Sequence, residues 1–178
     1  MLSSIQITEL DAPAVLGPHR QEVEELWRLV FPATTEERLA EILPRHAGRR
    51  GFRFLAARNR GGRLGGFTYG YRGGPGEWWH DHVAATLGPD GTARWLRPGH
   101  FELVELGVRP DLRRHGLGRR LHDELLAPLD APTAVLSTEQ DNAPALALYR
   151  GCGWQVIVDE LDFGPGYPPF VVMGKALA

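Results

Sequence analysis

The chain contains 178 residues, of which 43% are hydrophobic and 24% are charged, and its formal net charge at pH 7 is −2. This length and composition are typical of a globular protein, and we predict a single domain over residues 1–178. The small net charge excludes a general electrostatic attraction to nucleic acid or to an anionic membrane surface.

The chain shows no sign of export. Its first residues lack a basic leader and an apolar segment of signal-peptide length, and no later run approaches about 20 apolar residues. The single cysteine, Cys152, cannot form an internal disulfide, which agrees with a reducing compartment. We therefore expect a cytoplasmic protein. Lys175 is the only lysine beside many arginines, which favours a bacterial, GC-rich source.

The N-terminal part predicts one strand and two helices. Residues 4–10 alternate apolar and polar side chains as a strand does, and the segment Asp11-Ala12-Pro13 should break that strand. Residues 18–31 carry apolar side chains at helical spacing. A capping start at residues 34–37 opens a second helix, which we expect to end at Pro44.

A hairpin and an irregular insertion follow. Strands are predicted at residues 52–57 and 64–71, because the glycines between them allow the positive φ that a hairpin needs. Residues 73–100 are less regular, with a short helix at 82–87 and a Gly-Pro-Asp-Gly turn at 88–91. We expect this tryptophan-rich insertion to shape a substrate pocket.

The middle of the chain predicts a strand, a loop and a helix. Residues 101–108 are dense in Phe, Leu and Val, and the strand stops before Pro110, which cannot donate to a ladder. Leu117, Leu121 and Leu125 fall at i, i+4 and i+8 and form one apolar stripe of a helix.

The loop between them, Arg-Arg-His-Gly-Leu-Gly at residues 113–118, suits an anion. The first four N–H groups of a helix have no internal partner, and the helix dipole places about half a positive charge there. Gly116 and Gly118 have no side chain that would keep a phosphate from those amides. Five of the twenty Lys+Arg residues lie in this span: Arg109, Arg113, Arg114, Arg119 and Arg120.

The C-terminal part predicts a buried strand at residues 133–137, then a helix that begins at Asn142 and ends near Gly151 or Gly153. Asn142 and Tyr149 are seven residues apart and share one face of that helix. Two last strands follow at residues 154–161 and 169–177, joined by a Gly/Pro-rich loop.

These pieces together resemble a known family. The string Arg113-x-x-Gly116-x-Gly118, after an apolar strand ending in Val-x-Pro and before an amphipathic helix, resembles the acetyl-CoA-binding motif of the GNAT (Gcn5-related) N-acetyltransferases. The helix from Asn142 to Tyr149 and the order of elements agree with it over most of the chain. The resemblance implies an α/β (α+β) GNAT fold with a central mixed, mostly antiparallel sheet of six to seven strands and helices on both faces.

The resemblance also implies a reaction. Acetyl-CoA would be the cosubstrate, without a metal, and a primary amine on a small molecule or a protein would attack the thioester directly in a ternary complex. A homodimer through the C-terminal strands would fit the family. Neither nucleic acid nor a membrane is an expected partner. The amine itself stays open among a polyamine, an antibiotic, an amino acid and a protein terminus, and so does an acyl donor longer than acetyl.

Such a reaction needs a base. An alkyl ammonium of pKa ~10.4 lies ~3.4 units from its neutral form at pH 7, a cost of roughly 4–5 kcal/mol. Glu102 and Glu105 interrupt the apolar strand, where a charge is poorly placed unless it faces solvent or a cleft. We favour Glu105 as the base, and the resemblance also allows Glu102.

The remaining roles are implied by the resemblance. Tyr149 would donate to the leaving thiolate, and Asn142 would contact pantetheine or order its helix. The backbone of Leu106 and Val108 would pair with pantetheine, with the Leu106 amide as oxyanion donor. The cofactor-binding residues are then Leu106, Val108, Arg113, Arg114, Gly116, Leu117, Gly118, Arg119 and Asn142.

Other interpretations of the sequence stay open. A non-catalytic acyl-CoA-binding module would have the same fold. A nucleotide-phosphate-binding protein is weakened because the loop lacks the Gly-Lys-Ser/Thr of a P-loop. His80 and His82 flank Asp81 without a third metal ligand at suitable spacing. The tryptophans of the insertion should close a core or a dimer contact.

Overall fold

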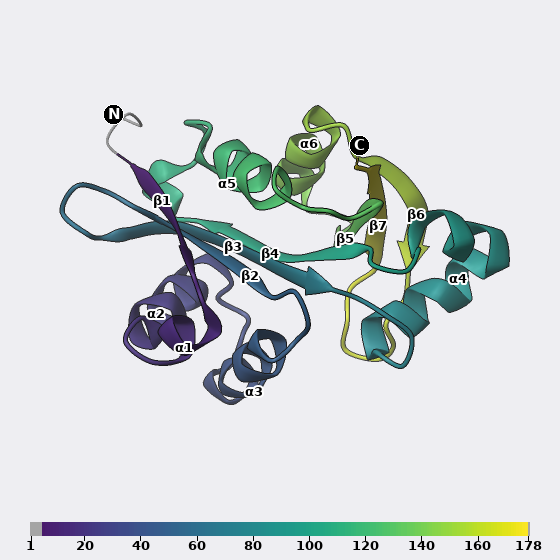
Figure 1. The fold of residues 1–178 in the computed structure, drawn as a ribbon, viewed down its shortest axis with the longest axis horizontal. Helices are drawn as coiled ribbons and strands as arrows, with labels where there is room; N and C mark the ends of the chain where they lie inside the picture. Colours follow the sequence, from purple (N-terminus) through teal and green to yellow (C-terminus); the bar gives the residue numbers. More distant parts are fainter. Residues whose placement is uncertain (1–4, 178) are drawn as a thin grey trace. The chain divides into compact units, whose positions relative to one another are not determined.

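The computed structural model describes residues 5–177, and the chain divides into two compact units (Figure 1). The described part of the first unit comprises residues 5–71 and 104–129, and that of the second comprises residues 72–103 and 130–177. Across this part of the chain, seven strands are hydrogen-bonded in the order β1-β2-β3-β4-β5-β7-β6. The predicted mixed sheet of six to seven strands is therefore confirmed, and β4 contributes residues to both units.

The first unit contains an antiparallel part of the sheet. Strand β1 (Gln6–Leu10) pairs with β2 (Arg53–Arg58), which in turn pairs with β3 (Leu64–Arg72). The amide of Arg109, directly after β4 (Phe101–Val108), donates to the Gly65 carbonyl at 2.9 Å. The predicted hairpin and central strand are thus confirmed to within one or two residues.

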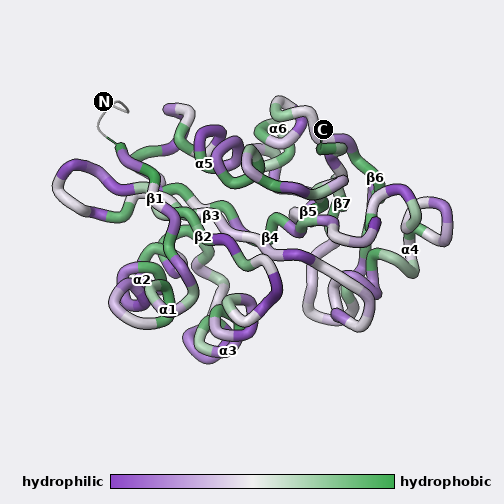
Figure 2. Tube along the Cα trace, viewed as in Figure 1, coloured by the Kyte–Doolittle hydropathy of each residue, from purple (hydrophilic) through white to green (hydrophobic). Residues whose placement is uncertain are grey.

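Helices cover both faces of this part of the sheet. Helices α1 (Ala12–Leu16), α2 (Arg20–Val30) and α3 (Glu36–Ala47) lie on one face, and α5 (Leu117–Leu126) lies on the other (Figure 1). Along α2, α3 and α5 hydrophilic and hydrophobic residues alternate (Figure 2), as expected for helices with one buried face. None of the helices within residues 5–177 is both long and apolar enough to cross a membrane.

The core of the first unit is aromatic. Trp27 of α2 stacks on Phe67 of β3 with ring centroids 5.4 Å apart, and both side chains are buried. On the opposite face, Leu117 and Leu121 of α5 reach Gly66, where a β-carbon would lie 3.0 Å from Leu121. The predicted leucine stripe is buried as expected, and each such side chain contributes about 1.5–3 kcal/mol.

Two predictions in the first unit are wrong. The expected break at residues 11–13 is the start of α1, because Asp11 Oδ1 accepts from the Ala14 amide at 2.9 Å and Pro13 lies in the first turn, where its missing N–H is not needed. Helix α3 passes through Pro44 and ends at Ala47. Ala47 is buried, and a proline this close to a helix end removes only one internal hydrogen bond.

The second unit contains the other strands. Strand β5 (Thr133–Glu139) pairs antiparallel with β7 (Phe170–Ala176), and β7 pairs with β6 (Gln155–Leu161). The start of β4 pairs with β5 in parallel at two positions, Phe101 with Ala134 and Glu102 with Val135. Helix α6 (Ala143–Gly151) connects β5 to β6 in sequence, as predicted.

The insertion is more regular than predicted. Instead of a short helix at 82–87, it holds α4 (Trp78–Trp95), which is kinked at Gly88, where φ is 69°. The predicted turn is this kink, and the helix resumes after it because side chains beyond it are buried. Thr133 of β5 donates to the Trp95 carbonyl at 2.8 Å, and Trp79 donates to the Ser137 hydroxyl at 2.9 Å. Trp95 closes the core as predicted, whereas Trp78 is exposed.

Candidate active site

The glycine and arginine loop leads directly into α5. A short 3-10 turn (Pro110–Leu112) follows β4, and Gly116 caps the helix with φ at 83°, a conformation that glycine adopts without strain. A β-carbon on Gly116 would meet no atom within 4 Å. The first helical bond runs from the Arg120 amide to the Gly116 carbonyl at 3.1 Å. The preceding amides have no partner within the helix, which makes this end of α5 suitable for an anion.

The arginines around this loop differ in their contacts. Arg113 Nε donates to the Val108 carbonyl at 3.0 Å. Two of the predicted cofactor-binding residues are therefore hydrogen-bonded to each other. Arg120 reaches the Ile5 carbonyl at 3.4 Å, and Arg109 pairs with Asp111 at 3.2 Å. Arg114 is exposed and has a positive φ of 64°, which is uncommon for a residue with a side chain. These contacts order the loop, and Arg114 is exposed on it.

Glu105 is half-buried on β4, and its backbone carbonyl accepts from the Thr68 hydroxyl at 2.9 Å. Burial raises the pKa of its carboxyl to about 8, against the opposing field of Arg38 on α3. A carboxyl with this pKa exchanges its proton close to neutral pH. That is the property a general base or acid needs.

Tyr69, which feels the charge of Glu105, and His46, which contacts Tyr69, stay neutral at pH 7. Burial raises the pKa of Tyr69 well above its ordinary value, and the charge of Glu105 adds to this rise. Burial lowers the pKa of His46 to about 4, with Arg45 and Arg49 acting in the same direction. Tyr69 and His46 were not found from the sequence, because only the packing of α3 on β3 brings them together.

Glu102 lies in the second unit, and its carboxyl is buried. It is 4% exposed, and its Oε1 lies 3.3 Å from Nε2 of His100. A β-carbon on Gly73 would lie 1.9 Å from the same oxygen, so only glycine leaves room for the carboxyl. The expectation that a charge on this strand faces solvent or a cleft is wrong for Glu102, because His100 partners it inside the protein.

Asn142 and Tyr149 lie at the two ends of α6. The Asn142 side chain caps the helix and accepts from the Ala145 amide at 3.2 Å, as its position predicts. The Tyr149 ring is buried and lies 5.8 Å from the Trp154 ring. Gly107 makes room for Phe67, whose ring would lie 3.1 Å from a β-carbon there.

The structure thus distributes the predicted residues over the two units. The first unit contains Glu105, Leu106, Val108, Arg113, Arg114, Gly116, Leu117, Gly118 and Arg119, and the second contains Glu102, Asn142 and Tyr149. Tyr69 beside Glu105, and His100 beside Glu102, join this set from the structure alone.

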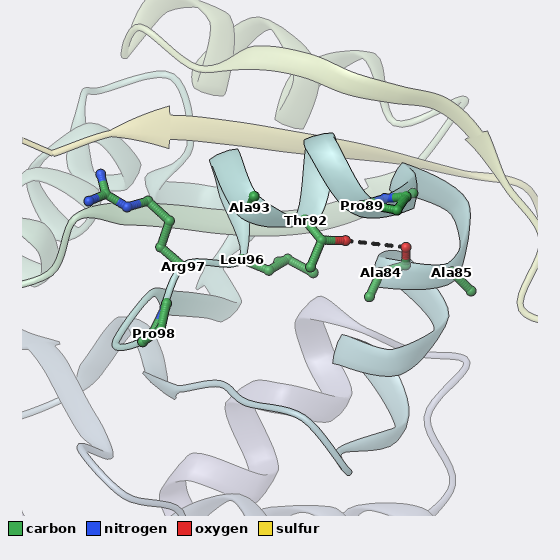
Figure 3. A pocket seen from close by; sticks show the side chains of 9 residues that line it. Ala84, Ala85, Pro89, Thr92, Ala93, Leu96, Arg97 and Pro98 are labelled. Carbon is green, nitrogen blue, oxygen red and sulfur yellow. Dashed lines mark hydrogen bonds between the residues drawn. The ribbon is translucent and has the colours of Figure 1, made fainter.

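A separate hollow of about 600 Å³ lies on α4 and the segment after it (Figure 3). Thr92 on its wall donates to the Ala84 carbonyl at 3.3 Å. Its lining is mostly apolar and consists of Ala84, Ala85, Gly88, Pro89, Thr92, Ala93, Leu96, Arg97 and Pro98. The predicted site residues lie elsewhere, so this hollow is not the predicted site.

Comparison with known proteins gives the family. The Acetyltransferase (GNAT) family matches residues 20–154. A GCN5-like protein acetyltransferase of Mycobacterium tuberculosis is 35% identical over 119 residues, which cover 63% of this chain and 58% of that relative. The chain therefore spans less than two thirds of that relative's length.

Two solved structures share the fold. NAA60 of Arabidopsis thaliana, in complex with acetyl-CoA, superposes with a TM-score of 0.69 at 16% identity over 97% of this chain and 98% of that chain. The ribosomal-protein-S18-alanine N-acetyltransferase of Escherichia coli gives a TM-score of 0.67 at 17% identity, with 98% of this chain and 94% of that chain covered. With the family match over well more than half of its length, this chain belongs to the acetyltransferase (GNAT) family.

Proposed function

We propose that this chain transfers the acetyl group of acetyl-CoA to a primary amine, which attacks the thioester directly in a ternary complex. The observation that carries the proposal is the open N-terminus of α5 at Gly116, which follows β4 and a short 3-10 turn, in a chain of the GNAT family. The similarity to a fold solved with acetyl-CoA supports the donor. We also propose that the chain acts as one domain in the bacterial cytoplasm.

The diphosphate of coenzyme A is assigned to the start of α5. The amides of Gly116, Leu117, Gly118 and Arg119 would bind it, because those N–H groups precede the first helical hydrogen bond. Arg114 would add a charge. Arg113 would act indirectly, since its Nε already holds the Val108 carbonyl and thereby shapes the loop.

The thioester is assigned to the backbone of β4. The amide of Leu106 would donate to the acetyl carbonyl and stabilise the negative charge of the tetrahedral intermediate. Leu106 and Val108 would pair with pantetheine as a neighbouring strand does. This assignment agrees with a β4–β5 ladder of two residue pairs, which covers only the first residues of β4. Asn142 would contact the pantetheine arm or order α6.

The proton transfers are assigned to three side chains. Glu105 is the favoured base, because a pKa of about 8 suits proton uptake at neutral pH. Glu102 is the alternative carboxylate. Tyr149 would donate to the thiolate of coenzyme A as the intermediate collapses. The acceptor is an amine of a small molecule or of a protein, and protein acceptors are named for two of the similar proteins.

The test is release of free thiol from acetyl-CoA over a panel of polyamines, aminoglycosides, amino acids and peptide N-termini. We expect at least one class to release thiol, and Tyr149→Phe to lower the rate with little change in acetyl-CoA affinity. Binding of acetyl-CoA without thiol release on any amine would instead support the non-catalytic acyl-CoA-binding module.

A further inference from the structure

Helix α3 and the turn after it carry a row of arginines in the first unit. Arg38 and Arg45 lie on the helix, and Arg49 follows its end at Ala47. The three are seven and four residues apart, so they lie on one side of the helix. The neighbouring side, with Leu39, is buried in the core of the unit. This arginine row therefore runs along the border between the core and solvent.

Contacts with β3 show where the arginine row lies. The Arg49 guanidinium is 5.8 Å from the centre of the Tyr71 ring. The ring of His46, which follows Arg45, is 5.2 Å from the Tyr71 ring, and its Nδ1 is 2.9 Å from the Tyr69 hydroxyl oxygen. Burial, and then the charges of Arg45 and Arg49, lower the pKa of His46. The C-terminal part of the arginine row thus lies beside the tyrosines of β3.

Glu105 points to the same face of the sheet. A β-carbon on Gly107 would lie 3.2 Å from Val30 of α2, and Glu105 is two residues earlier on β4, so its side chain lies on that side. Burial raises the pKa of Glu105, and the charge of Arg38 opposes this rise. Burial, and then the charge of Glu105, raise the pKa of Tyr69. Arg38 and Glu105 are therefore close enough to act on each other within one unit.

The surroundings of Glu105 are positive at neutral pH. Because its pKa is about 8, its carboxyl is mostly protonated at pH 7 and does not neutralise the charge of Arg38. Glu37 is next to Arg38 in sequence, but adjacent residues of a helix do not face each other. The other acidic residues of α3 have arginine partners, namely Glu36 with Arg28 at 2.6 Å and Glu41 with Arg45 at 3.6 Å. A ligand with a negative group would be attracted here, and a polycation repelled.

We propose that Arg38 is a specificity-determining residue that binds a carboxylate carried by the acceptor close to its amine. This role rests on the proposed function, in which Glu105 takes a proton from that amine. Arg38 is exposed, and a guanidinium binds a carboxylate through two parallel hydrogen bonds. The acceptor is then a free amino acid or the N-terminus of a peptide whose first residue is acidic.

The same contact would help the amine to lose its proton. A carboxylate beside an ammonium stabilises the charged form and so raises the pKa of the amine. A carboxylate paired with Arg38 no longer does so, and the neutral nucleophile becomes easier to form. A polyamine has no carboxylate and would bring further positive charges to the arginine row. We therefore expect polyamines to be poor acceptors.

Thiol release from acetyl-CoA with matched amines tests the selection. Alanine is compared with alaninamide, the dipeptide amide Asp-Ala-NH2 with Asn-Ala-NH2, and both pairs with putrescine, with rates expressed for the neutral amine. The carboxylate-bearing member of at least one pair should have a kcat/KM about tenfold higher than its partner. The pair that shows this preference identifies the source of the carboxylate. Equal values within both pairs, or turnover only of amines without a carboxylate, would overturn the proposal.

Variants of Arg38 test whether this side chain causes the preference. Arg38→Gln should lower kcat/KM for the carboxylate-bearing amine about tenfold, chiefly through KM, and change that of its amide partner less than about twofold. Arg38→Glu should reverse the preference. Arg60→Gln, which removes the same charge from the exposed hairpin loop of the same unit, is the matched control and should keep the wild-type preference. Equal losses for both members of the pair in Arg38→Gln would speak for a merely structural role and against the proposal.

Nuclear magnetic resonance tests the site without acetyl transfer. The Glu105 carboxyl carbon should titrate with a pKa of about 8 in wild type and with a higher pKa in Arg38→Gln. N-acetylalanine or N-acetyl-Asp-Ala-NH2, which carry the two carboxylates, should raise this pKa in wild type and leave it unchanged in Arg38→Gln. The same pKa in both proteins, or no effect of either compound on wild type, would refute the assignment. If no amine releases thiol, the proposed function fails, while this titration still decides whether Arg38 binds a carboxylate beside Glu105.

Discussion

The hydroxyl oxygen of Tyr69 lies 2.9 Å from Nδ1 of His46, which joins β3 to α3 inside the first unit. Because the pKa of His46 is lowered to about 4, its ring is neutral at pH 7, and one of the two groups donates this hydrogen bond to the other. Burial disfavours the charged form of the ring. It follows that the folded first unit gains most stability from this histidine above the ordinary pKa of histidine.

Acid should weaken the first unit through His46. A histidine whose folded pKa lies below its unfolded value binds protons preferentially in the unfolded state, so the free energy of unfolding falls as the pH drops from about 6.5 to about 4. His46→Gln should flatten this dependence, as measured by urea unfolding at pH 4.5 and 7. His115→Gln, in the exposed loop before α5, should leave the slope as it is. An equal slope in wild type and His46→Gln would contradict the assignment.

Glu105 should lower the stability of the folded state at higher pH. Its folded pKa is about 8, above the ordinary value of 4.5, so its ionisation destabilises the folded state as the pH rises from about 4.5 to 8. Glu105→Gln removes the ionisation. We expect this variant to gain stability relative to wild type between pH 5 and pH 8.5 and to lose acetyl transfer. Unfolding curves at both pH values measure the first effect. A stability difference that does not change with pH would argue against a raised pKa of Glu105.

Gly118→Asp should abolish binding of acetyl-CoA. The new carboxylate would lie in the first turn of α5, where the diphosphate is proposed to bind, and like charges repel there. Isothermal titration calorimetry measures the affinity. Gly74→Asp is the control, because it adds the same charge at a position with open space around it. Unchanged affinity in Gly118→Asp would remove the assignment of the phosphate site.

Gly73→Ala should destabilise the second unit by roughly 1–3 kcal/mol. The added methyl group would lie 1.9 Å from Glu102 Oε1 and 2.5 Å from His100 Nε2, so the buried pair must move. Urea unfolding measures the loss. The neighbouring Gly74→Ala meets nothing within 4 Å and should stay within about 0.5 kcal/mol of wild type. Similar losses in both variants would mean that backbone freedom, not the Glu102 contact, is the cause.

Local patterns predicted most elements and missed those that depend on packing. The strand at residues 101–108, the leucine stripe of α5 and the Asn142 cap were readable because each is a short-range rule of periodicity or capping. The continuation of α3 beyond Pro44 could not be predicted in this way, since buried contacts beyond the proline outweigh one lost hydrogen bond. Helix α4 was missed for the same reason, as its contacts with β5 hold it on both sides of the kink.

By itself, the sequence determined the family-like order of strands and helices, the glycine loop before an amphipathic helix, and the two glutamates of the central strand, because spacing and residue type decide these locally. Only the tertiary structure decided the environments of those glutamates. The two glutamates are three residues apart on one strand. Glu105 is half-buried and has a raised pKa, whereas Glu102 is buried and packs against His100 and Gly73. The difference comes from neighbours distant in the sequence, since burial and hydrogen-bond partners, and not the identity of the residue, set the proton affinity of a carboxyl.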